Sequence, residues 1–185
     1  MNLSNPYLYS DIESFEIGEK NIVLSFSTRL SRENDWSSSY SERVIKEYKK
    51  FIYLCCVSNQ QLTPSDQVDQ VWHLHLAYTQ SYWNEMCRKV LKTDIHHGPT
   101  KGGGKETNKY KQQYLFTTNF YEKEFGEEPP KDIWPNVTHR FENADKFIRI
   151  NESEFWIVKK PSKYIAPIFF ASLFLTACSN DGDGS

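Results

Sequence analysis

The sequence predicts a mainly α-helical fold, organised as a single-domain helical bundle, on three observations. Apolar residues recur at helical spacing through most of the chain. Helix boundaries are marked by capping residues, namely Ser39 with Glu42, Thr63 with Pro64, and Gly126. Aromatic residues make up 15% of the 185 residues, which indicates a core built from large rings. A chain of this length can bury one such core.

The first part of the chain leads into two helices. Residues 1–20 are expected to be irregular or to form a short helix. The stretch 21–26 fits either a short strand or the entry to a helix over 27–33. Ser39 and Glu42 form a capping box. The box opens a second helix whose apolar residues are Val44, Tyr48, Phe51, Ile52 and Cys55.

The third predicted helix is the most strongly marked. Thr63 serves as its N-cap, Pro64 takes the first helical position, and Asp66 follows three residues after the cap. The helical periodicity continues without interruption to Leu91. One face forms a core stripe that contains a histidine, and its members are Val68, Trp72, His75, Leu76, Thr79, Tyr82, Trp83, Met86 and Val90.

The later part of the chain alternates loops with one long helix. A loop over 93–105 carries two histidines and three consecutive glycines. The helix after it ends at Gly126. The Pro-rich stretch 127–135 contains Trp and Ile, which favours an ordered loop. Residues 147–158 are β-prone with short periods, a pattern compatible with a short C-terminal β-hairpin.

A candidate metal site is centred on Asp69 and His73, whose side chains meet on one helical turn. The carboxylate either fixes the imidazole tautomer or joins it in binding an ion. His97 is the candidate third ligand. An unbroken helix puts Leu91 about 27 Å from His73, and six extended residues return at most about 20 Å. The three-residue site therefore requires a broken or shortened helix. Mixed oxygen and nitrogen ligands favour zinc or another divalent transition ion.

Several further residues are candidates to support this site. His75 diverges from His73 by roughly 200° on a regular helix, so the two cannot easily share an ion. We expect His75 to be a core histidine with one satisfied hydrogen bond. The structural alternative to a metal site is a buried Asp69–His73 pair held by Arg29. The complete supporting set is Arg29, Glu33, Trp72, His75 and His96.

Charge and cysteine content narrow the function classes. The chain has 22 basic and 24 acidic residues and a formal net charge of −2. This balance offers no electrostatic basis for binding nucleic acid. Cys55, Cys56 and Cys87 show no Cys-x-x-Cys spacing. We interpret them as reduced packing residues of a cytoplasmic domain.

The C-terminal region carries a second functional signal. The predicted helical domain spans 21–158, followed by a basic-flanked apolar segment at 159–178 and a polar tail at 179–185. The apolar run of ~14 residues is shorter than the ~20 that a spanning helix requires. We nevertheless expect residues 164–178 to contact a membrane, with the domain on the cytoplasmic side. The alternatives are a buried core helix and a soluble cytoplasmic protein.

The segment Thr63–Leu76 also supports a family resemblance. Its pattern Thr-Pro-Ser-x-x-Val-Asp-x-Val-Trp-His-x-His-Leu resembles bacterial glycine-rich domain-containing proteins. It is more distantly similar to the N-terminal domain of unknown function in plant glycine-rich domain proteins. The resemblance covers about residues 22–158 and implies a mostly helical domain without an established activity. The other segments that carry it are 26–34 with Trp36, 48–51, 96–99, 125–130 and 133–135.

Two functional hypotheses follow, from different classes. The first is a membrane-tethered helical binding or interaction module, in which Asp69 and His73 form a structural polar centre. Its partner is an unknown protein or small-molecule ligand. The alternative is a small divalent-metal-dependent enzyme, for example a hydrolase, centred on the same two residues. The enzyme requires one bound ion per chain and a solvent-open cleft beside the pair.

Overall fold

A computed structural model describes residues 3–19, 22–98, 102–142 and 158. The chain divides into two compact units, residues 1–147 and 148–185, and Val158 is the described residue of the second. In the first unit the mainly α prediction is confirmed, and the described ranges contain no strand. The predicted hairpin lies, except for Val158, outside those ranges.

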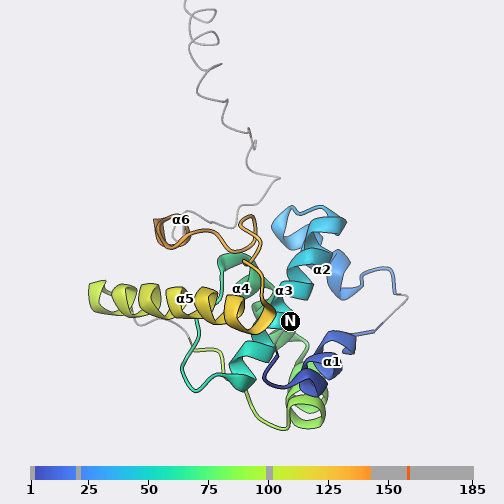
Figure 1. The fold of residues 1–185 in the computed structure, drawn as a ribbon. Helices are drawn as coiled ribbons and strands as arrows, with labels where there is room; N and C mark the ends of the chain where they lie inside the picture. The colour runs from blue at the N-terminus through green and yellow to red at the C-terminus, as the bar shows by residue number, and fades with distance from the viewer. Residues whose placement is uncertain (1–2, 20–21, 99–101, 143–157, 159–185) are drawn as a thin grey trace, which may run out of the picture. The chain divides into compact units, whose positions relative to one another are not determined.

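The helices of the first unit are arranged around one central helix, α3 (Figure 1). α3 packs against α1, α2, α4 and α5. The element η1 is π-helical, with hydrogen bonds that span five residues instead of four. In chain order the elements are α1 (Pro6–Ser14), α2 (Phe26–Asn34), α3 (Ser38–Val57), α4 (Asp66–Ala77), η1 (Gln80–Leu91), α5 (Gly104–Phe125) and α6 (Val137–Glu142).

The N-terminal half differs from expectation only in its boundaries. Helix α1 realises one of the two alternatives for residues 1–20, and residues 22–25 form a turn rather than a strand. The α3 cap is Ser37, whose hydroxyl accepts a hydrogen bond from the Tyr40 N–H at 3.2 Å, so the prediction of Ser39 was two residues late. Both residues are serines, and the upstream one takes the cap.

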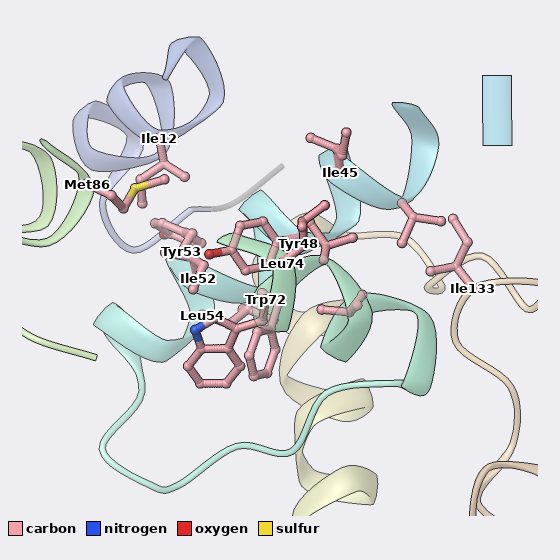
Figure 2. Close-up of a cluster of buried hydrophobic side chains, with 14 of the residues drawn as sticks. Ile12, Ile45, Tyr48, Ile52, Tyr53, Leu54, Trp72, Leu74, Met86 and Ile133 are labelled. Carbon is pink, nitrogen blue, oxygen red and sulfur yellow. The ribbon is translucent and has the colours of Figure 1, made fainter. Parts of the chain in front are cut away.

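The core is built from large rings, as the composition predicted (Figure 2). Side chains of α3 such as Tyr48, Ile52 and Leu54 meet Trp72 of α4 and Met86 of η1. A buried tyrosine hydroxyl needs a hydrogen-bond partner, and these partners tie distant segments together. Among the described residues, the fully buried tyrosines are Tyr48, Tyr53, Tyr82, Tyr114 and Tyr121.

The helix predicted to begin after Thr63 starts two residues later. Ser65 is the cap of α4, and its hydroxyl accepts a hydrogen bond from the Val68 N–H at 3.2 Å. The Thr63 hydroxyl instead donates to Gln113 on α5 at 3.0 Å, and the Thr63 N–H donates to Thr117 at 3.1 Å. Thr63 therefore fastens the chain to α5 and leaves capping to Ser65.

The prediction of one helix running to Leu91 was wrong, because the chain leaves helical geometry at Tyr78 (φ −85°, ψ 61°). The Tyr78 side chain is held by neighbouring segments. Its ring packs edge-on against Phe26 at 5.3 Å between centroids, and its hydroxyl accepts a hydrogen bond from Arg29 at 3.2 Å. Gly18 lies so close that an added Cβ would sit 3.0 Å from the ring. The break is thus enforced by tertiary contacts.

The predicted membrane segment at 159–178 lies outside the described residues. Within the ranges that are described, none of the helices combines the length and the apolar character needed to cross a bilayer.

The predicted end of the long helix after the glycine loop is confirmed, since Gly126 follows α5 in a left-handed conformation with φ 71°. α6 is a short helix that the sequence analysis missed.

Candidate metal centre

Three of the predicted site residues converge at the surface of α4. One ligand atom each from Asp69, His73 and His97 lies within 4.8 Å of the other two. His97 Nε2 is 2.8 Å from Asp69 Oδ1, and His73 Nε2 is 3.9 Å from Asp69 Oδ2. The two imidazole rings are 4.5 Å apart between centroids. The structure therefore brings together an acid and two imidazoles, here called the Asp–His–His cluster.

The helix break at Tyr78 is what admits His97 to this cluster. Asp69 and His73 are neighbours because four residues separate them on α4. His97 follows Asp69 by 28 residues and comes from the loop after η1. A continuous helix would have carried the chain about 27 Å from His73 before the loop began. The condition set by the sequence analysis, a broken or shortened helix, is met.

A chain of hydrogen bonds holds the His97 loop against α4. The Trp72 indole N–H donates to the Tyr82 hydroxyl at 2.9 Å, and that hydroxyl donates to the Ile95 carbonyl at 2.5 Å. Burial raises the pKa of the nearby Cys87 thiol, and the Ile95 backbone opposes this shift. Trp72 also packs edge-on against the His97 ring at 4.6 Å. His97 is thus placed by groups from both α4 and η1.

The cluster is partly shielded on one side and open on the other. The side chains of Asp69 and His97 are 19% and 18% exposed, whereas that of His73 is 50% exposed. A second acid, Asp66, lies about one turn before Asp69 on α4, and its carboxylate is 3.7 Å from the guanidinium group of Arg140 on α6. Burial raises the pKa of Asp66, Arg140 opposes this shift, and the charge of Asp69 adds to it. Both acids occupy the first turn of α4, where the helix dipole favours negative charge.

The donor set suits a divalent transition ion. With metal–ligand bonds of 2.0–2.2 Å, neighbouring donors in a tetrahedral site lie about 3.4 Å apart. The two measured separations, 2.8 and 3.9 Å, fall on either side of this value. Two imidazoles and one carboxylate occur at catalytic zinc sites, and also at non-haem iron(II) sites. Without an ion, the Asp69–His97 contact is a hydrogen bond.

The other predicted supporting residues have different roles. Arg29 and Glu33 lie on α2, 3.8 Å from each other, and Arg29 donates to Tyr78 instead of holding Asp69. The structural alternative had Arg29 holding the Asp69–His73 pair, whereas the side chain that bonds to Asp69 is His97. His96 is exposed, and its ring lies 5.4 Å from that of Trp83. Trp72 alone of these residues contacts the cluster and positions it.

His75 is confirmed as a core histidine, with two hydrogen bonds instead of the one expected. It has no exposed surface. Its Nδ1 lies 2.8 Å from the Tyr48 hydroxyl and its Nε2 lies 3.1 Å from the Ser81 hydroxyl. Burial, with a smaller contribution from the charge of Lys49, lowers the pKa of His75 to about 3. The ring is therefore neutral at physiological pH.

The sequence did not predict that Tyr82 supports the loop of His97 or that Ser81 bonds to His75. Both contacts depend on the path of the chain after Tyr78. The sequence analysis also missed a cavity of about 590 Å³ that lies away from the cluster. Residues of α1, of the segment after it, of α2 and of α3 line this cavity, among them Phe15 and Phe26, and none of the three cluster residues does.

Comparison with known proteins identifies relatives for this sequence. The family model for UCP032817-like proteins matches residues 20–121, a range that contains the whole Asp–His–His cluster. The chain belongs to this family. Over 106 residues it is 26% identical to "Glycine-rich domain-containing protein 1" and 24% identical to "Glycine-rich domain-containing protein 2", both of Arabidopsis thaliana. The resemblance to glycine-rich domain proteins is thus confirmed.

The extent of these matches is limited. The aligned region covers 55% of this chain and 13% of each Arabidopsis protein. No solved structure matches the chain. The comparisons therefore identify a family and leave the chemistry to be inferred from the site.

Proposed function

We propose that this member of the UCP032817-like family is a divalent-metal-binding helical domain, which holds one zinc or related transition ion between Asp69, His73 and His97. The observation that carries this proposal is the approach of three donor atoms, from two separate segments, to within 4.8 Å of one another. An acid and a histidine one turn apart are common on helices. A second imidazole, brought from 28 residues away by a hydrogen-bonded loop, supports a specific site.

In this proposal the ion joins α4 to the loop that carries His97. A ligand that binds only the folded state stabilises it, so metal binding would fix the path of the chain after η1. The half-exposed His73 places the ion at the surface. Such a centre suits a binding module whose partner is a protein or a small molecule.

A metal-dependent hydrolase is the second candidate, and the exposure of His73 is the observation that favours it. Three protein ligands leave a coordination position open, and an ion bound there would lower the pKa of a water molecule to about 7. The cavity of about 590 Å³ lies away from the cluster, however. Its position supports the binding module over the enzyme.

The test is zinc binding by the full-length chain after removal of metal with a chelator. We expect one equivalent of Zn²⁺ in the parent protein. Asp69→Asn, His73→Gln and His97→Gln should each weaken binding by at least about tenfold, which corresponds to 1.4 kcal/mol. His96→Gln is the matched control, because it removes a histidine from the same loop without touching the cluster.

Two results would contradict the proposal. The first is a parent protein that binds no Zn²⁺, Mn²⁺, Co²⁺ or Fe²⁺ with defined stoichiometry. The second is an equal loss of binding in His96→Gln and His97→Gln, which would place the ion elsewhere. Measured hydrolysis of a phosphate or carboxylic ester that requires the bound ion would favour the enzyme over the module.

We also infer that residues 159–178 tether the domain to a membrane, with the domain on the cytoplasmic side. Support comes from the sequence alone, in which three lysines precede the apolar run Ile165–Cys178. The full-length chain should float with lipid vesicles in a density gradient, and the double substitution Phe169→Asp with Leu173→Asp should abolish flotation. A parent chain that stays in the aqueous fraction would contradict the inference.

A further inference from the structure

The cavity away from the cluster has the size of a small-molecule site. Its volume is about 590 Å³, within the range typical of ligand pockets. It is bounded by the end of α1 and the segment after it, by the start of α2, by one face of α3, and by Pro130 and Ile133. It is independent of the metal centre, because no residue of the Asp–His–His cluster lines it.

Aromatic rings form part of the cavity wall. Tyr9, Phe15 and Phe26 all line it. Tyr9 and Phe26 are buried, and Tyr9 is fixed by edge-on packing against Tyr53 at 5.4 Å between centroids. The face of an aromatic ring attracts a cation, most strongly where water is excluded. The wall can therefore contact both the apolar body and the charged group of an organic cation.

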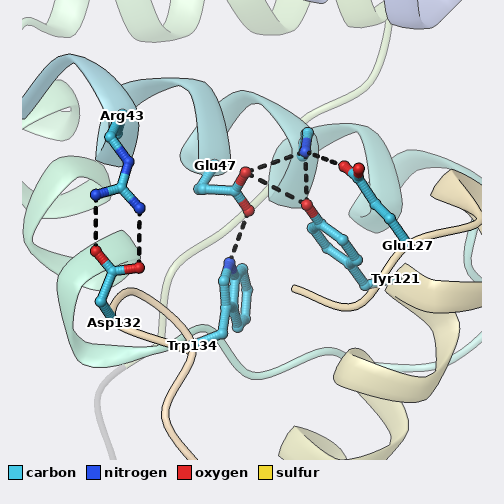
Figure 3. A network of polar contacts seen from close by, with 7 residues as sticks. Arg43, Glu47, Tyr121, Glu127, Asp132 and Trp134 are labelled. Atoms are coloured by element: carbon cyan, nitrogen blue, oxygen red, sulfur yellow. Dashed lines mark hydrogen bonds and ion pairs between the residues drawn. The ribbon is translucent and has the colours of Figure 1, made fainter. Parts of the chain in front are cut away.

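A buried carboxylate lies among the cavity-lining residues. Glu47 is 6% exposed, and it accepts hydrogen bonds from the Trp134 indole at 2.9 Å and the Tyr121 hydroxyl at 3.3 Å (Figure 3). Lys50 lies 3.1 Å from Glu47 and 3.0 Å from Glu127. One ammonium group thus faces two carboxylates, and this network carries a net negative charge.

The same carboxylates affect the pKa of the Tyr9 hydroxyl. Burial raises the pKa of Tyr9, and the charges of Glu13, Glu47 and Glu127 raise it further. Lys50 is the base that opposes them. Glu13 makes the largest charge contribution to this shift, and its carboxylate favours a cation beside the ring.

Basic residues also line the cavity, but several have acceptors of their own. The lining includes five glutamates and four lysines or arginines. Arg43 is bound through both terminal nitrogens to Asp132, at 2.8 Å each. Lys49 donates to the Glu13 backbone carbonyl at 2.8 Å. Glu16 and Glu19 extend the acidic rim on the α1 side.

We propose that this cavity binds a small organic cation, an amine with an apolar body. The apolar body lies against Tyr9 and Phe26, and the ammonium group faces Glu13 at the exposed rim. The site discriminates by charge, so a neutral or anionic molecule of the same size binds more weakly.

The test is an NMR titration of the isotope-labelled full-length chain with phenethylamine. The matched probes are 2-phenylethanol, which is neutral, and 3-phenylpropionate, which is anionic. We expect saturable shifts for residues such as Tyr9, Phe26 and Ile45. We also expect phenethylamine to bind at least about tenfold more tightly than either analogue, a difference that the charge alone supplies.

Substitutions at the exposed rim keep the fold intact and locate the site. Glu13→Gln combined with Glu16→Gln should weaken phenethylamine binding about fivefold or more, because two nearby carboxylates are lost. Glu128→Gln is the control, since Glu128 is exposed, pairs with Lys131 and does not line the cavity.

Several outcomes would overturn the proposal. They are equal binding of phenethylamine and 2-phenylethanol, tighter binding of 3-phenylpropionate, and shifts confined to residues outside the cavity. An equal effect of the rim and control substitutions would also overturn it. So would the absence of saturation up to about 10 mM phenethylamine, a concentration well above that of a weak specific site.

Discussion

His73 and His75 lie on the same helix, two residues apart, in opposite environments. The His73 side chain is half exposed and lies 3.9 Å from Asp69, beside a second imidazole. His75 has no exposed surface and bonds to two hydroxyl groups. The angular step of a helix, about 200° over two residues, separates them. One histidine is therefore accessible to a metal ion, whereas the other is held neutral.

The difference lies in the neighbours and not in the residue type. Around His75 the nearest rings belong to Phe15, Phe26, Tyr48 and Tyr82, with centroids 5.1–6.1 Å away. Hydroxyl groups satisfy both ring nitrogens, but they cannot balance a positive charge. His73 has the Asp69 carboxylate and open solvent. The same side chain thus serves as core packing on one face of α4 and as a ligand candidate on the other.

Replacing each histidine by alanine should give the largest contrast. His75→Ala leaves the Tyr48 and Ser81 hydroxyls without their partner and opens a cavity. We expect a loss of about 3 kcal/mol in the free energy of unfolding. His73→Ala should change it by less than about 0.5 kcal/mol in the absence of metal. Urea unfolding at pH 7.5 with a chelator measures both, and equal losses would refute the contrast.

Acid should destabilise the protein through His75. Its folded pKa of about 3 lies below the ordinary value of 6.5, so the unfolded chain binds a proton first as the pH falls. Stability therefore decreases below pH 6.5, by about 2 kcal/mol between pH 7.5 and 5. His75→Gln should lack this part of the dependence. If His75→Gln and the parent lose the same stability over this interval, the ring is not held neutral.

Removing single tyrosine hydroxyls should separate the two sides of α4. Tyr82→Phe deletes the link between Trp72 and the Ile95 carbonyl. We expect Zn²⁺ affinity to fall about tenfold, because the His97 loop loses its outer support. Tyr48→Phe is the matched change on the His75 side, and it should lower stability by about 1 kcal/mol while leaving Zn²⁺ affinity within about twofold. Calorimetric titration compares the two, and an effect of Tyr48→Phe on affinity as large as that of Tyr82→Phe would argue against this separation.

The smallest effect is expected for His96. It is exposed beside Trp83 and adjacent to His97 in sequence. His96→Ala should change the free energy of unfolding by less than about 0.5 kcal/mol and leave Zn²⁺ binding unaltered. Thermal unfolding with and without zinc measures both quantities. A substantial loss of zinc-dependent stabilisation would make His96 a ligand and would require a different cluster.

Local sequence patterns were sufficient to predict much of α4. The four-residue spacing of Asp69 and His73 places them together on any helix, and the apolar stripe correctly assigned His75 to the core. The helical end at Gly126 followed from the same kind of local rule. These features depend on residues within one or two turns, which a sequence displays directly.

The helix break and its consequences could not be predicted from local sequence patterns. Tyr78 is an ordinary helical residue by local pattern, and its position is enforced by Gly18, Phe26 and Arg29 from distant segments. The cap assigned to Thr63 moved to Ser65 for the same reason, since α5 engages Thr63. His97 could be named only as a conditional ligand until the break was known.

The π-helical geometry of η1 makes this region sensitive to chain length. In η1 five-residue hydrogen bonds accommodate the twelve residues between Thr79 and Lys92, and the left-handed Lys92 then starts the return to α4. Deleting one residue there would change the rotation and rise of the chain that follows, which would turn His97 away from Asp69. A deletion among the exposed glycines Gly102 and Gly103 would not reach the cluster, which precedes them. Between Ser81 and His97, insertions and deletions should therefore disrupt the Asp–His–His cluster more than substitutions do.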